Sequence, residues 1–477
     1  MAILQSYGAD RVVTGSCHIL RLESGVNIAI DCGLFQGREE KRNRKPFGFD
    51  PSEVDFLLIT HAHLDHVGRI PLLVKEGFRG TIVATRATLE LANIVLLDSA
   101  HLMEEEYRTR YRKALRRGTE KRVEPPLFVR EDVENIWLLP TVEARYGKKI
   151  KLTKGATVRY FDAGHILGSA FLEIRYDCGG EKRTIVFSGD LGNAEEIVMP
   201  HTHRSRSANH IVIESTYGDR DHRPMKKSVS EFKKAVRETL LNRGNVLIPS
   251  FAIERTQDIL CILKDMYLNR ELPYCKVFLD SPMAIRATNI FTNHIDELSE
   301  KCKEHYRIDG DPFFFPWLHF SVETEDSKKI NSIEGGAIII AGSGMCTGGR
   351  ILHHFKHNIW NRRNSVIFVG YQAEGTLGRK IVDGARWIKL YHEKIMVKAR
   401  IYTINGFSAH AGQSELLEWI ENFSTIDNIF LVHGEDRKLE ALKKAIRKRV
   451  RMDAVIVDSG VKYNPDRKRS KRRADDI

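Results

Sequence analysis

Three histidines and an aspartate lie within one stretch of six residues, at His61, His63, Asp65 and His66. They directly follow the apolar run 54–60 (VDFLLIT), which has the length of a strand. Imidazole and carboxylate groups are ligands that suit zinc. Because side chains alternate along an extended segment, His61 and His63 can face one ion. Asp65 and His66 can then turn toward a second ion, so the cluster predicts a metal site.

A single loop cannot supply all the ligands of a two-metal site, so distant ligands are expected. His165, Asp190 and His433 each follow an apolar run and lie beside a glycine that permits a sharp backbone turn. Taken singly, each would more often be an ordinary polar loop residue. Together with the first cluster they become candidate ligands, and the two oxygens of Asp190 allow it to bridge two ions.

Several further motifs occur in an order that resembles the β-CASP family of nucleases, which are hydrolases of the metallo-β-lactamase fold. The motifs are IDCGLFQG at 30–37, IESTYGDR at 213–220, PSFAIERTQ at 249–257, AGSGMCTGGR at 341–350, GYQAEGTLGR at 370–379 and GFSAHA at 406–411. The resemblance covers nearly the whole chain except its basic tail. Within the family the chain is similar to the RNA-processing members, the nuclease subunit of the cleavage and polyadenylation specificity factor and its short prokaryotic relatives.

This resemblance implies two Zn²⁺ ions per chain and a role for each candidate ligand. One ion is expected on His61, His63, His165 and Asp190, and the other on Asp65, His66 and His433 with Asp190 shared. Asp31 is implied as the group that orients the loop of histidines, since metal ligands usually need such support.

The resemblance also implies catalytic residues. His410 and Glu214 are expected as a hydrogen-bonded pair near the scissile phosphate, and Asp65 is expected to be catalytic as well as metal-binding. Two zinc ions roughly 3.5–4 Å apart would promote hydroxide formation and offset charge on the phosphodiester. His410, held charged by Glu214, is the hypothesised general acid for the departing sugar oxygen.

The expected activity is zinc-dependent hydrolysis of RNA phosphodiester bonds, endonucleolytic, leaving a 5′-phosphate and a 3′-hydroxyl. RNA is favoured over DNA because a histidine at position 433 resembles the RNA-processing members of the family. The alternatives are a 5′-to-3′ exoribonuclease, a small-molecule hydrolase on the same metal fold, and an RNA-binding scaffold without activity. RNA is the expected partner, no membrane partner is expected, and a homodimer is left open.

Substrate contacts are expected outside the metal cluster. The glycine-rich segment 341–350 has no Walker A ending and no dinucleotide fingerprint, so a tight turn and a phosphate cradle are both compatible with it. The resemblance favours substrate contact for three of its residues, Ser343, Gly344 and Arg350. Ser408 and Arg255 are further candidates of the same kind.

Apolar runs of strand length recur along the chain and end in polar residues, which is typical of an α/β protein. Between about 215 and 390 they alternate with helical segments, as in βα units around a parallel sheet. We expect a metallo-β-lactamase αββα sandwich with an inserted β-CASP α/β domain and RNA in the cleft between them. The expected boundaries are 1–207 and 391–461 for the sandwich, 208–390 for the insert, and 462–477 for a basic tail.

The charge of the 477-residue chain is uneven, with a formal net charge of +12. Residues 105–122 and 436–453 each carry 8 basic and 3 acidic groups, and residues 462–477 carry 7 and 3. These segments can contact a polyanion, although a solvated face explains them equally well. Segment 105–122 also interleaves tyrosines with arginines, a pattern compatible with base stacking.

The rest of the composition indicates the class of protein and the cellular compartment. With 42% hydrophobic and 29% charged residues, the chain has the composition of a globular protein rather than a disordered one. Its 7 cysteines are scattered without a C-x-x-C pair, which argues against a disulfide framework. No signal-like start and no long apolar run is present, so a cytoplasmic location is expected.

Overall fold

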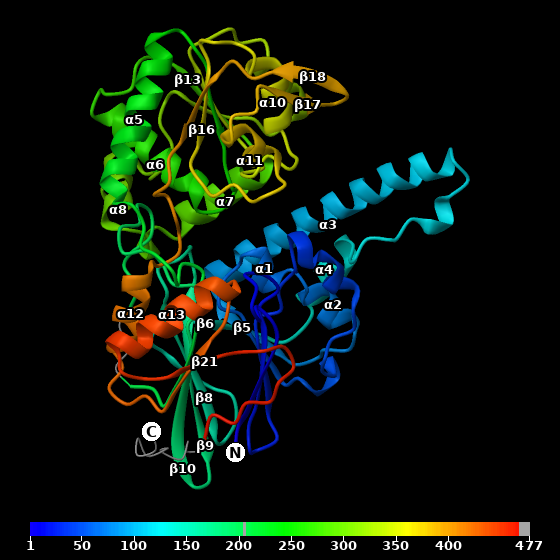
Figure 1. The fold of residues 1–477 in the computed structure, drawn as a ribbon, viewed down its shortest axis with the longest axis vertical. Coiled ribbons are helices and arrows are strands. Elements are labelled where there is room, and N and C mark those ends of the chain that lie inside the picture. Colours follow the sequence, from blue (N-terminus) through cyan, green and yellow to red (C-terminus); the bar gives the residue numbers. More distant parts are fainter. Residues whose placement is uncertain (204–206, 467–477) are drawn as a thin grey trace, which may run out of the picture. The chain divides into compact units, whose positions relative to one another are not determined.

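The computed structural model describes residues 1–203 and 207–466, and these residues form two compact units. The second unit contains residues 193–201 and 222–409, and the first unit contains the rest (Figure 1). Most of the expected basic tail, from residue 467 onward, lies outside the described residues. Within the described part, no helix combines the length and the apolar character that a bilayer crossing requires.

The first unit contains two sheets. Its strands are β1 (Ile3–Gly8), β2 (Cys17–Arg21), β3 (Asn27–Ile30), β4 (Phe56–Leu58), β5 (Thr81–Thr85), β6 (Thr141–Ala144), β7 (Lys149–Lys151), β8 (Ala156–Asp162), β9 (Ala170–Cys178), β10 (Glu181–Phe187), β11 (His210–Ile213), β20 (Asn428–Leu431) and β21 (Ala454–Ile456). One sheet has the order β1-β2-β3-β4-β5-β6 and the other β21-β20-β11-β10-β9-β8-β7. Apolar residues of both sheets, such as Ile28 and Leu58 from one and Leu172 and Phe187 from the other, form one core.

Helices cover the outer faces of these sheets. They are α1 (Leu64–Val67), α2 (Ile70–Lys75), α3 (Arg86–Leu115), α4 (Arg130–Ile136), α12 (Gln413–Glu421) and α13 (Asp436–Arg449), with the short 3-10 helices η1 (Gly37–Arg44), η2 (Pro51–Glu53) and η3 (Glu120–Arg122). A second core joins α12 and α13 to the sheet through Trp419, Leu442, Ile211 and Ile429. The helix α3 contacts β5 of the other sheet. The first unit is therefore layered helix, sheet, sheet, helix, as expected from the sequence.

The second unit is built around one parallel sheet. Its strands are β12 (Val246–Pro249), β13 (Lys276–Asp280), β14 (Leu318–Phe320), β15 (Ala337–Ala341), β16 (Ser365–Phe368) and β19 (Arg400–Thr403), with a separate hairpin of β17 (Trp387–Leu390) and β18 (Glu393–Met396). The sheet order is β14-β13-β15-β12-β16-β19, and each of its strand pairs is parallel. This architecture confirms the βα alternation that the sequence predicts.

The helices of the second unit alternate with those strands along the chain. They are α5 (Met225–Leu241), α6 (Arg255–Leu268), α7 (Pro282–Asn293), α8 (Glu300–Asp309), α9 (Thr324–Ile330), α10 (Ile351–Asn358) and α11 (Leu377–Val382), with the 3-10 helix η4 (Ile295–Glu297).

Strand pairing moves both expected domain junctions further along the chain. β11 lies after the expected junction at 207/208, yet it pairs with β10 and β20 of the first unit. β19 lies after the expected junction at 390/391, yet it pairs with β16 of the second unit. The expectation that segment 391–409 returns to the first domain therefore needs correction. A short apolar strand looks the same in either sheet, because its sequence does not record which distant strand it joins.

Candidate metal centre

The candidate ligands lie at the ends of strands in the first unit. β8, β10, β11 and β20 run in the same direction, so their carboxyl ends meet at one edge of the sheet. The residues that follow these four strands include His165, Asp190, Glu214 and His433, in that order. Polar side chains distant in sequence are thereby brought to one edge, where ligand sites of open α/β sheets occur.

The first predicted ligand group is assembled in the structure. His63 Nδ1 lies 3.1 Å from both His61 Nε2 and His165 Nε2. Asp190 Oδ2 lies 3.5 Å from His61 Nε2 and 3.7 Å from His165 Nε2. Burial lowers the pKa of His61 and lowers that of His63 to about 4, so both rings offer neutral lone pairs at pH 7. These four side chains can surround one metal ion.

The second predicted group, Asp65, His66 and His433, is assembled beside the first. His433 Nε2 lies 3.6 Å from Asp65 Oδ2, and His66 Nε2 lies 3.4 Å from Asp190 Oδ2. The other oxygen of Asp190, Oδ1, lies 3.5 Å from His433 Nδ1. Asp190 therefore lies between the two groups, as a bridging ligand must.

Several inward-facing atoms of this cluster have no hydrogen-bond partner. His66 Nε2, His433 Nε2 and Asp190 Oδ1 are buried and unsatisfied within the described part of the chain. An unsatisfied buried polar atom costs about 1–3 kcal/mol. Three such atoms converging on one place are explained if cations complete their bonding, and the set of histidines and carboxylates suits zinc. The residues present therefore fit the implied metal.

Asp31 supports the loop of histidines in the manner the sequence predicts. Asp31 Oδ1 accepts a hydrogen bond from the backbone N–H of Thr60 at 2.8 Å, and Oδ2 accepts one from the Thr60 hydroxyl at 2.8 Å. His66 Nδ1 lies 2.7 Å from Asp31 Oδ2. Such a bond fixes the ring and directs Nε2 toward the metal position.

His410 and Glu214 form the hydrogen-bonded pair that the sequence predicts. His410 Nδ1 lies 3.2 Å from Glu214 Oε1 and 3.9 Å from Asp190 Oδ2. Glu214 is fully buried and also accepts hydrogen bonds from the backbone N–H groups of Leu191 and Thr216. Although burial lowers it, the pKa of His410 is raised to about 10 by the Glu214 carboxylate and by Asp190. These two carboxylates therefore favour the protonated form of the imidazole near neutral pH.

Two threonines complete the centre, and the sequence analysis missed them. Thr60 bonds Asp31, and the Thr216 hydroxyl lies 3.1 Å from His433 Nδ1. Each lies within two residues of a predicted site residue, His61 or Glu214. That adjacency is the only signal that could have indicated them, since an isolated threonine carries no metal-binding pattern.

Arg255, an expected substrate contact, lies in the second unit with little exposure to solvent. It is only 5% exposed, and its guanidinium bonds Asp258 Oδ2 at 2.6 Å and Glu254 Oε1 at 3.2 Å. These carboxylates and Glu196 form a further acidic group of the second unit. The ion pairs account for a buried arginine at this position, so its contact with RNA stays a prediction.

The glycine-rich segment forms a tight turn after β15. Ser343 Oγ accepts hydrogen bonds from the backbone N–H groups of Thr347 and Gly348. Gly344 lies against the ring of Phe251, where a Cβ would approach within 2.7 Å. The structure thus supports the tight-turn interpretation of this segment, and substrate contact by Ser343 and Gly344 stays a prediction.

The two remaining substrate candidates are held by internal bonds. Arg350 donates to Asp280 Oδ1 at 2.7 Å and to the carbonyls of Ser321 and Val322. The carbonyl of Ser408 lies 3.5 Å from Asn193 Nδ2, in the second unit. Their contact with RNA also stays a prediction.

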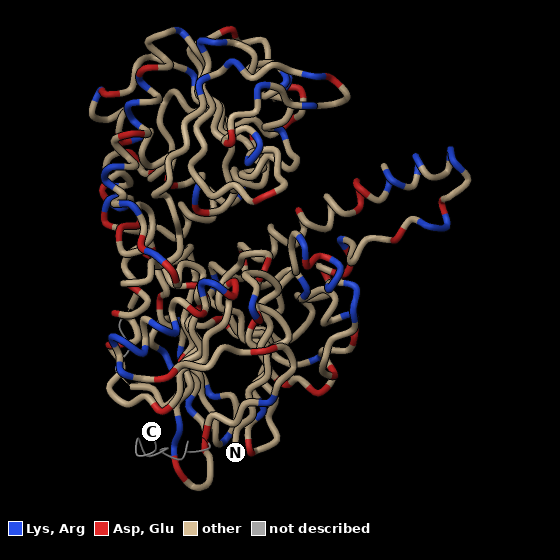
Figure 2. The backbone as a smooth tube through the Cα atoms, viewed as in Figure 1, with Lys and Arg blue, Asp and Glu red and all other residues tan. Residues whose placement is uncertain are grey.

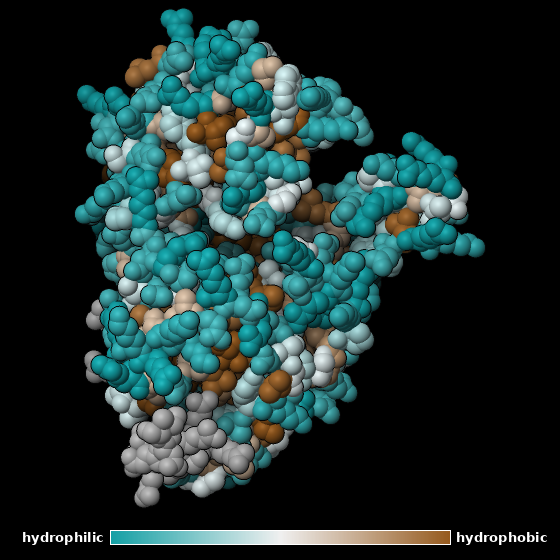
Figure 3. Space-filling view, viewed as in Figure 1, coloured by the Kyte–Doolittle hydropathy of each residue, from teal (hydrophilic) through white to brown (hydrophobic). Residues whose placement is uncertain are grey.

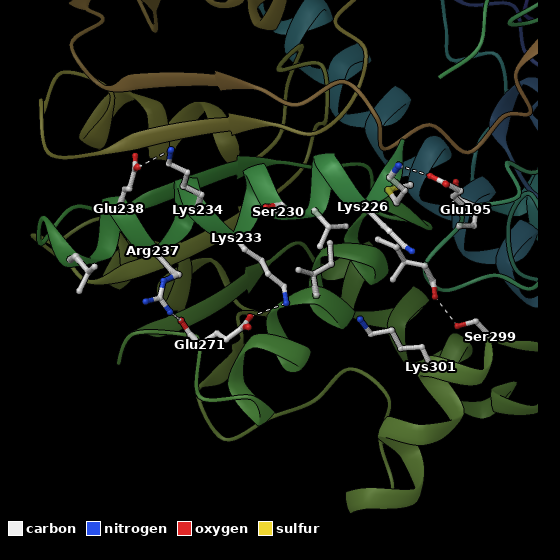
Figure 4. Close-up of a pocket in the computed structure, with 16 residues that line it drawn as sticks. Glu195, Lys226, Ser230, Lys233, Lys234, Arg237, Glu238, Glu271, Ser299 and Lys301 are labelled. Carbon is white, nitrogen blue, oxygen red and sulfur yellow. Dashed lines mark hydrogen bonds and ion pairs between the residues drawn. The ribbon is translucent and has the colours of Figure 1, made fainter. Parts of the chain in front are cut away.

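A large cavity of about 940 Å³ lies along α5 in the second unit (Figure 4). Lys233 projects into it and bonds Asp265 and Glu271 at 2.9 Å each. None of the predicted site residues lines this cavity. The convergent candidate metal ligands lie instead in the first unit.

Comparison with known proteins agrees with this architecture. Residues 10–143 match the metallo-beta-lactamase superfamily, residues 256–381 match the Beta-Casp domain, and residues 394–457 match a Zn-dependent metallo-hydrolase RNA specificity domain. The chain belongs to the β-CASP family of metallo-β-lactamase-fold hydrolases. Its fold class is that expected from the sequence, a metallo-β-lactamase sandwich with an inserted β-CASP domain.

Particular relatives are similar over most of this chain. Ribonuclease TTHA0252 of Thermus thermophilus is 43% identical over 442 residues, which cover 92% of this chain and 95% of the relative. Transcription termination factor FttA of Cenarchaeum symbiosum is 30% identical over 467 residues, covering 94% of this chain and 69% of the relative. FttA of Methanocaldococcus jannaschii is 29% identical over 453 residues, covering 92% of this chain and 68% of the relative.

Proposed function

We propose that this protein is a zinc-dependent ribonuclease that cuts RNA internally and leaves a 5′-phosphate and a 3′-hydroxyl. The observation that carries the proposal is the His410–Glu214 pair, which lies beside a cluster able to hold two ions. A metal-bound hydrolase of small molecules needs no such protonated imidazole aimed at a leaving group. Similarity to a protein named ribonuclease supports RNA as the substrate.

We assign the ligands as the sequence predicts. His61, His63, His165 and Asp190 would hold one zinc ion, and Asp65, His66 and His433 would hold the second with Asp190 shared. Bound zinc supplies positive charge that makes water a nucleophile near neutral pH and offsets the charge of the attacked phosphate. Asp31 and Thr60 keep His66 in one orientation, and Thr216 does the same for His433.

His410 is proposed as the proton donor to the departing sugar oxygen. Its Nδ1 faces Glu214, so Nε2 is the nitrogen left to face a substrate. Its side chain is 21% exposed, whereas that of Glu214 is fully buried, so the imidazole can meet a ligand while its partner stays out of contact with water. A general acid must be protonated at the working pH, and the Glu214 carboxylate favours that form.

One experiment separates the proposal from its alternatives. Wild type and Asp190→Ala are incubated with 5′-labelled RNA, 3′-labelled RNA and single-stranded DNA of the same sequence. We expect wild type to give internal RNA fragments from both labels, and Asp190→Ala to give none because both ligand groups lose a shared carboxylate. Mononucleotides released from the 5′ end would indicate an exoribonuclease instead.

Two other outcomes would contradict the proposal. Equal cutting of DNA would remove RNA as the preferred substrate. Intact RNA together with a full content of zinc would favour a small-molecule hydrolase or an inactive RNA-binding scaffold. A homodimer and a cytoplasmic location stay predictions from the sequence.

A further inference from the structure

The far part of α3 and the turn that follows it project from the first unit. We propose that this arm, residues 101–123, binds the backbone of RNA at a distance from the metal centre and thereby favours long substrates. The inference rests on the proposed ribonuclease function for its effect on cleavage, but the binding itself can be measured without cleavage.

The arm has no hydrophobic core of its own. All the buried residues of α3 lie between Ala87 and Ala100, although the helix continues to Leu115 (Figure 1). Helices in proteins are stabilised mainly by packing of an apolar face. The base of the arm is held in place by two contacts. Arg44 pairs with Glu124 at 2.9 Å, and Glu104 accepts a hydrogen bond from the backbone N–H of Arg130. A held but uncovered helix is suited to contact something outside the protein.

Charge is sorted along the arm. Near its base, Arg108 pairs with Glu105 and Arg110 pairs with Glu106, both at 2.9 Å. Basic residues gather toward its tip (Figure 2). Six of them form no ion pair with any residue that the structure describes. They are Arg112, Lys113, Arg116, Arg117, Lys121 and Arg122. With Glu120 as the one acidic residue between Arg112 and Arg122, the tip is strongly cationic, which makes it complementary to a polyanion.

Simpler explanations account for only part of this charge. Cations in the last turn of a helix interact favourably with its dipole, which explains Arg112 and Lys113. The same effect extends to Arg116, the C-cap residue of α3, but not to Lys121 and Arg122, which lie in η3 several residues beyond the end of α3. Figure 3 shows the arm as mostly hydrophilic, unlike a surface that binds an apolar protein partner.

Tyrosines provide a second contact suited to RNA. The rings of Tyr107 and Tyr111 lie 5.8 Å apart along one side of the arm, and Tyr111 is 38% exposed. Exposed aromatic rings beside a cationic groove or stripe are where bases of single strands stack. Charge and stacking together favour single-stranded RNA over an acidic protein.

The base of the helix contacts the metal centre's own loop. The hydroxyls of Thr85 and Thr88 both donate to the carbonyl of Gly168, at 2.7 and 2.8 Å, and Gly168 lies three residues after the ligand His165. At 1.5 Å per residue, the helix carries its tip about 40 Å from this contact. Only an RNA long enough to reach both places can use them together.

The test removes the charge of the tip. The arm variant combines Arg112→Gln, Lys113→Gln, Arg116→Gln and Arg117→Gln. A matched control combines Lys148→Gln, Lys149→Gln, Lys151→Gln and Lys154→Gln, four exposed lysines at and beside β7 that form no ion pair with any described residue. For the arm variant we expect kcat/KM on RNA of about 40 nucleotides to fall at least about tenfold, and kcat/KM on RNA of about 6 nucleotides to stay unchanged.

Binding of the long RNA is measured separately by fluorescence anisotropy at several salt concentrations. The slope of log affinity against log salt should become shallower by about 3 in the arm variant, because each lost phosphate contact removes about 0.7. The control should keep the wild-type slope. A second variant of the wild-type chain, with Arg112→Lys, Arg116→Lys and Arg117→Lys, keeps the charge and should bind the long RNA as wild type does.

Each outcome has a distinct meaning. An arm variant with wild-type affinity and slope would overturn the proposal, and would leave an acidic protein as the remaining partner for the tip. An equal loss in arm variant and control would also overturn it, since total charge alone would then explain binding. If wild type cut neither RNA, the proposed ribonuclease function would fail, while the anisotropy measurement would still decide whether the arm binds RNA.

Discussion

At the residue scale, the metal-directed histidines are oriented by what their other nitrogen contacts. His66 uses Nδ1 for Asp31 and His433 uses Nδ1 near Thr216, which leaves Nε2 of both rings facing the centre. His410 likewise uses Nδ1 for Glu214, but it belongs to neither group of candidate ligands. The neighbour of each ring therefore determines which of its two nitrogens is available to a metal ion or a substrate.

The first prediction concerns the charge of His410. A general acid acts while it is protonated, so activity should be present below the pKa of His410 and fall as the pH rises through it. Glu214→Gln removes the carboxylate that raises this pKa, so the alkaline limb of kcat/KM should move at least about one unit toward lower pH.

The measurement is a pH profile of RNA cleavage for wild type, Glu214→Gln and His410→Ala. Glu440→Gln, which changes an exposed glutamate on α13, is the matched control and should keep the wild-type profile. If Glu214→Gln keeps the same alkaline limb while His410→Ala loses activity, Glu214 does not set the protonation of His410.

At the scale of elements, α13 combines a structural face with a basic one. Leu439, Leu442 and Ile446 recur at helical spacing and are fully buried. The opposite face exposes Lys444 and Lys448, and the helix begins three residues after the proposed ligand His433. A basic surface that starts so close to the centre can contribute to RNA binding.

The prediction for α13 is a change in salt dependence. Replacing Lys443, Lys444 and Lys448 together by glutamine should make the slope of log RNA affinity against log salt shallower by about 2. Replacing Lys148, Lys149 and Lys151 is the control with the same loss of charge. An unchanged slope in the α13 variant would show that this face of the helix contacts solvent and does not bind RNA.

At the scale of the whole first unit, the first and the last segments that the structure describes meet. Asp466 accepts hydrogen bonds from the backbone N–H of Ala2 and the Tyr176 hydroxyl, both at 2.9 Å, and lies 3.2 Å from His210 Nε2. Leu4 and Tyr463 pair as an antiparallel bridge. Although burial raises it, the pKa of Asp466 is held well below its usual range by these hydrogen bonds. The carboxylate joins segments that lie at opposite ends of the sequence.

The prediction concerns stability and its dependence on pH. A carboxyl group whose pKa is lower in the folded state stabilises the fold above the unfolded pKa, near 4, and this contribution is lost as the pH falls below it. Asp466→Asn should therefore reduce the free energy of unfolding at pH 7 by about 1–3 kcal/mol. The difference from wild type should shrink below about pH 4. Thermal unfolding midpoints at both pH values check this, and a constant difference would contradict it.

The sequence was informative where the signal is local. Positions 61–66 combine ligand types and spacing in one loop, and the βα alternation from 215 to 390 depends on runs of neighbouring residues. The expected junctions put residues 193–201, β11 and β19 in the other unit from the one they join, because strand pairing and tertiary contacts are long-range properties. The length of α3 was not predicted, since its second half is rich in charged residues and none of that half is buried.

What the sequence determined by itself was the kind of chemistry: which side chains can bind metal, which family they resemble, and where cations concentrate. Only the tertiary structure decided that Asp190 lies between the two groups of proposed ligands and that Glu214 belongs to the same unit as these residues. It also decided that Thr60 and Thr216 lie within hydrogen-bond distance of Asp31 and His433. The physical reason is that ligand type is a property of single residues. Distances of 3 to 4 Å between atoms from separate strands arise only when parallel strands bring their carboxyl ends to one edge.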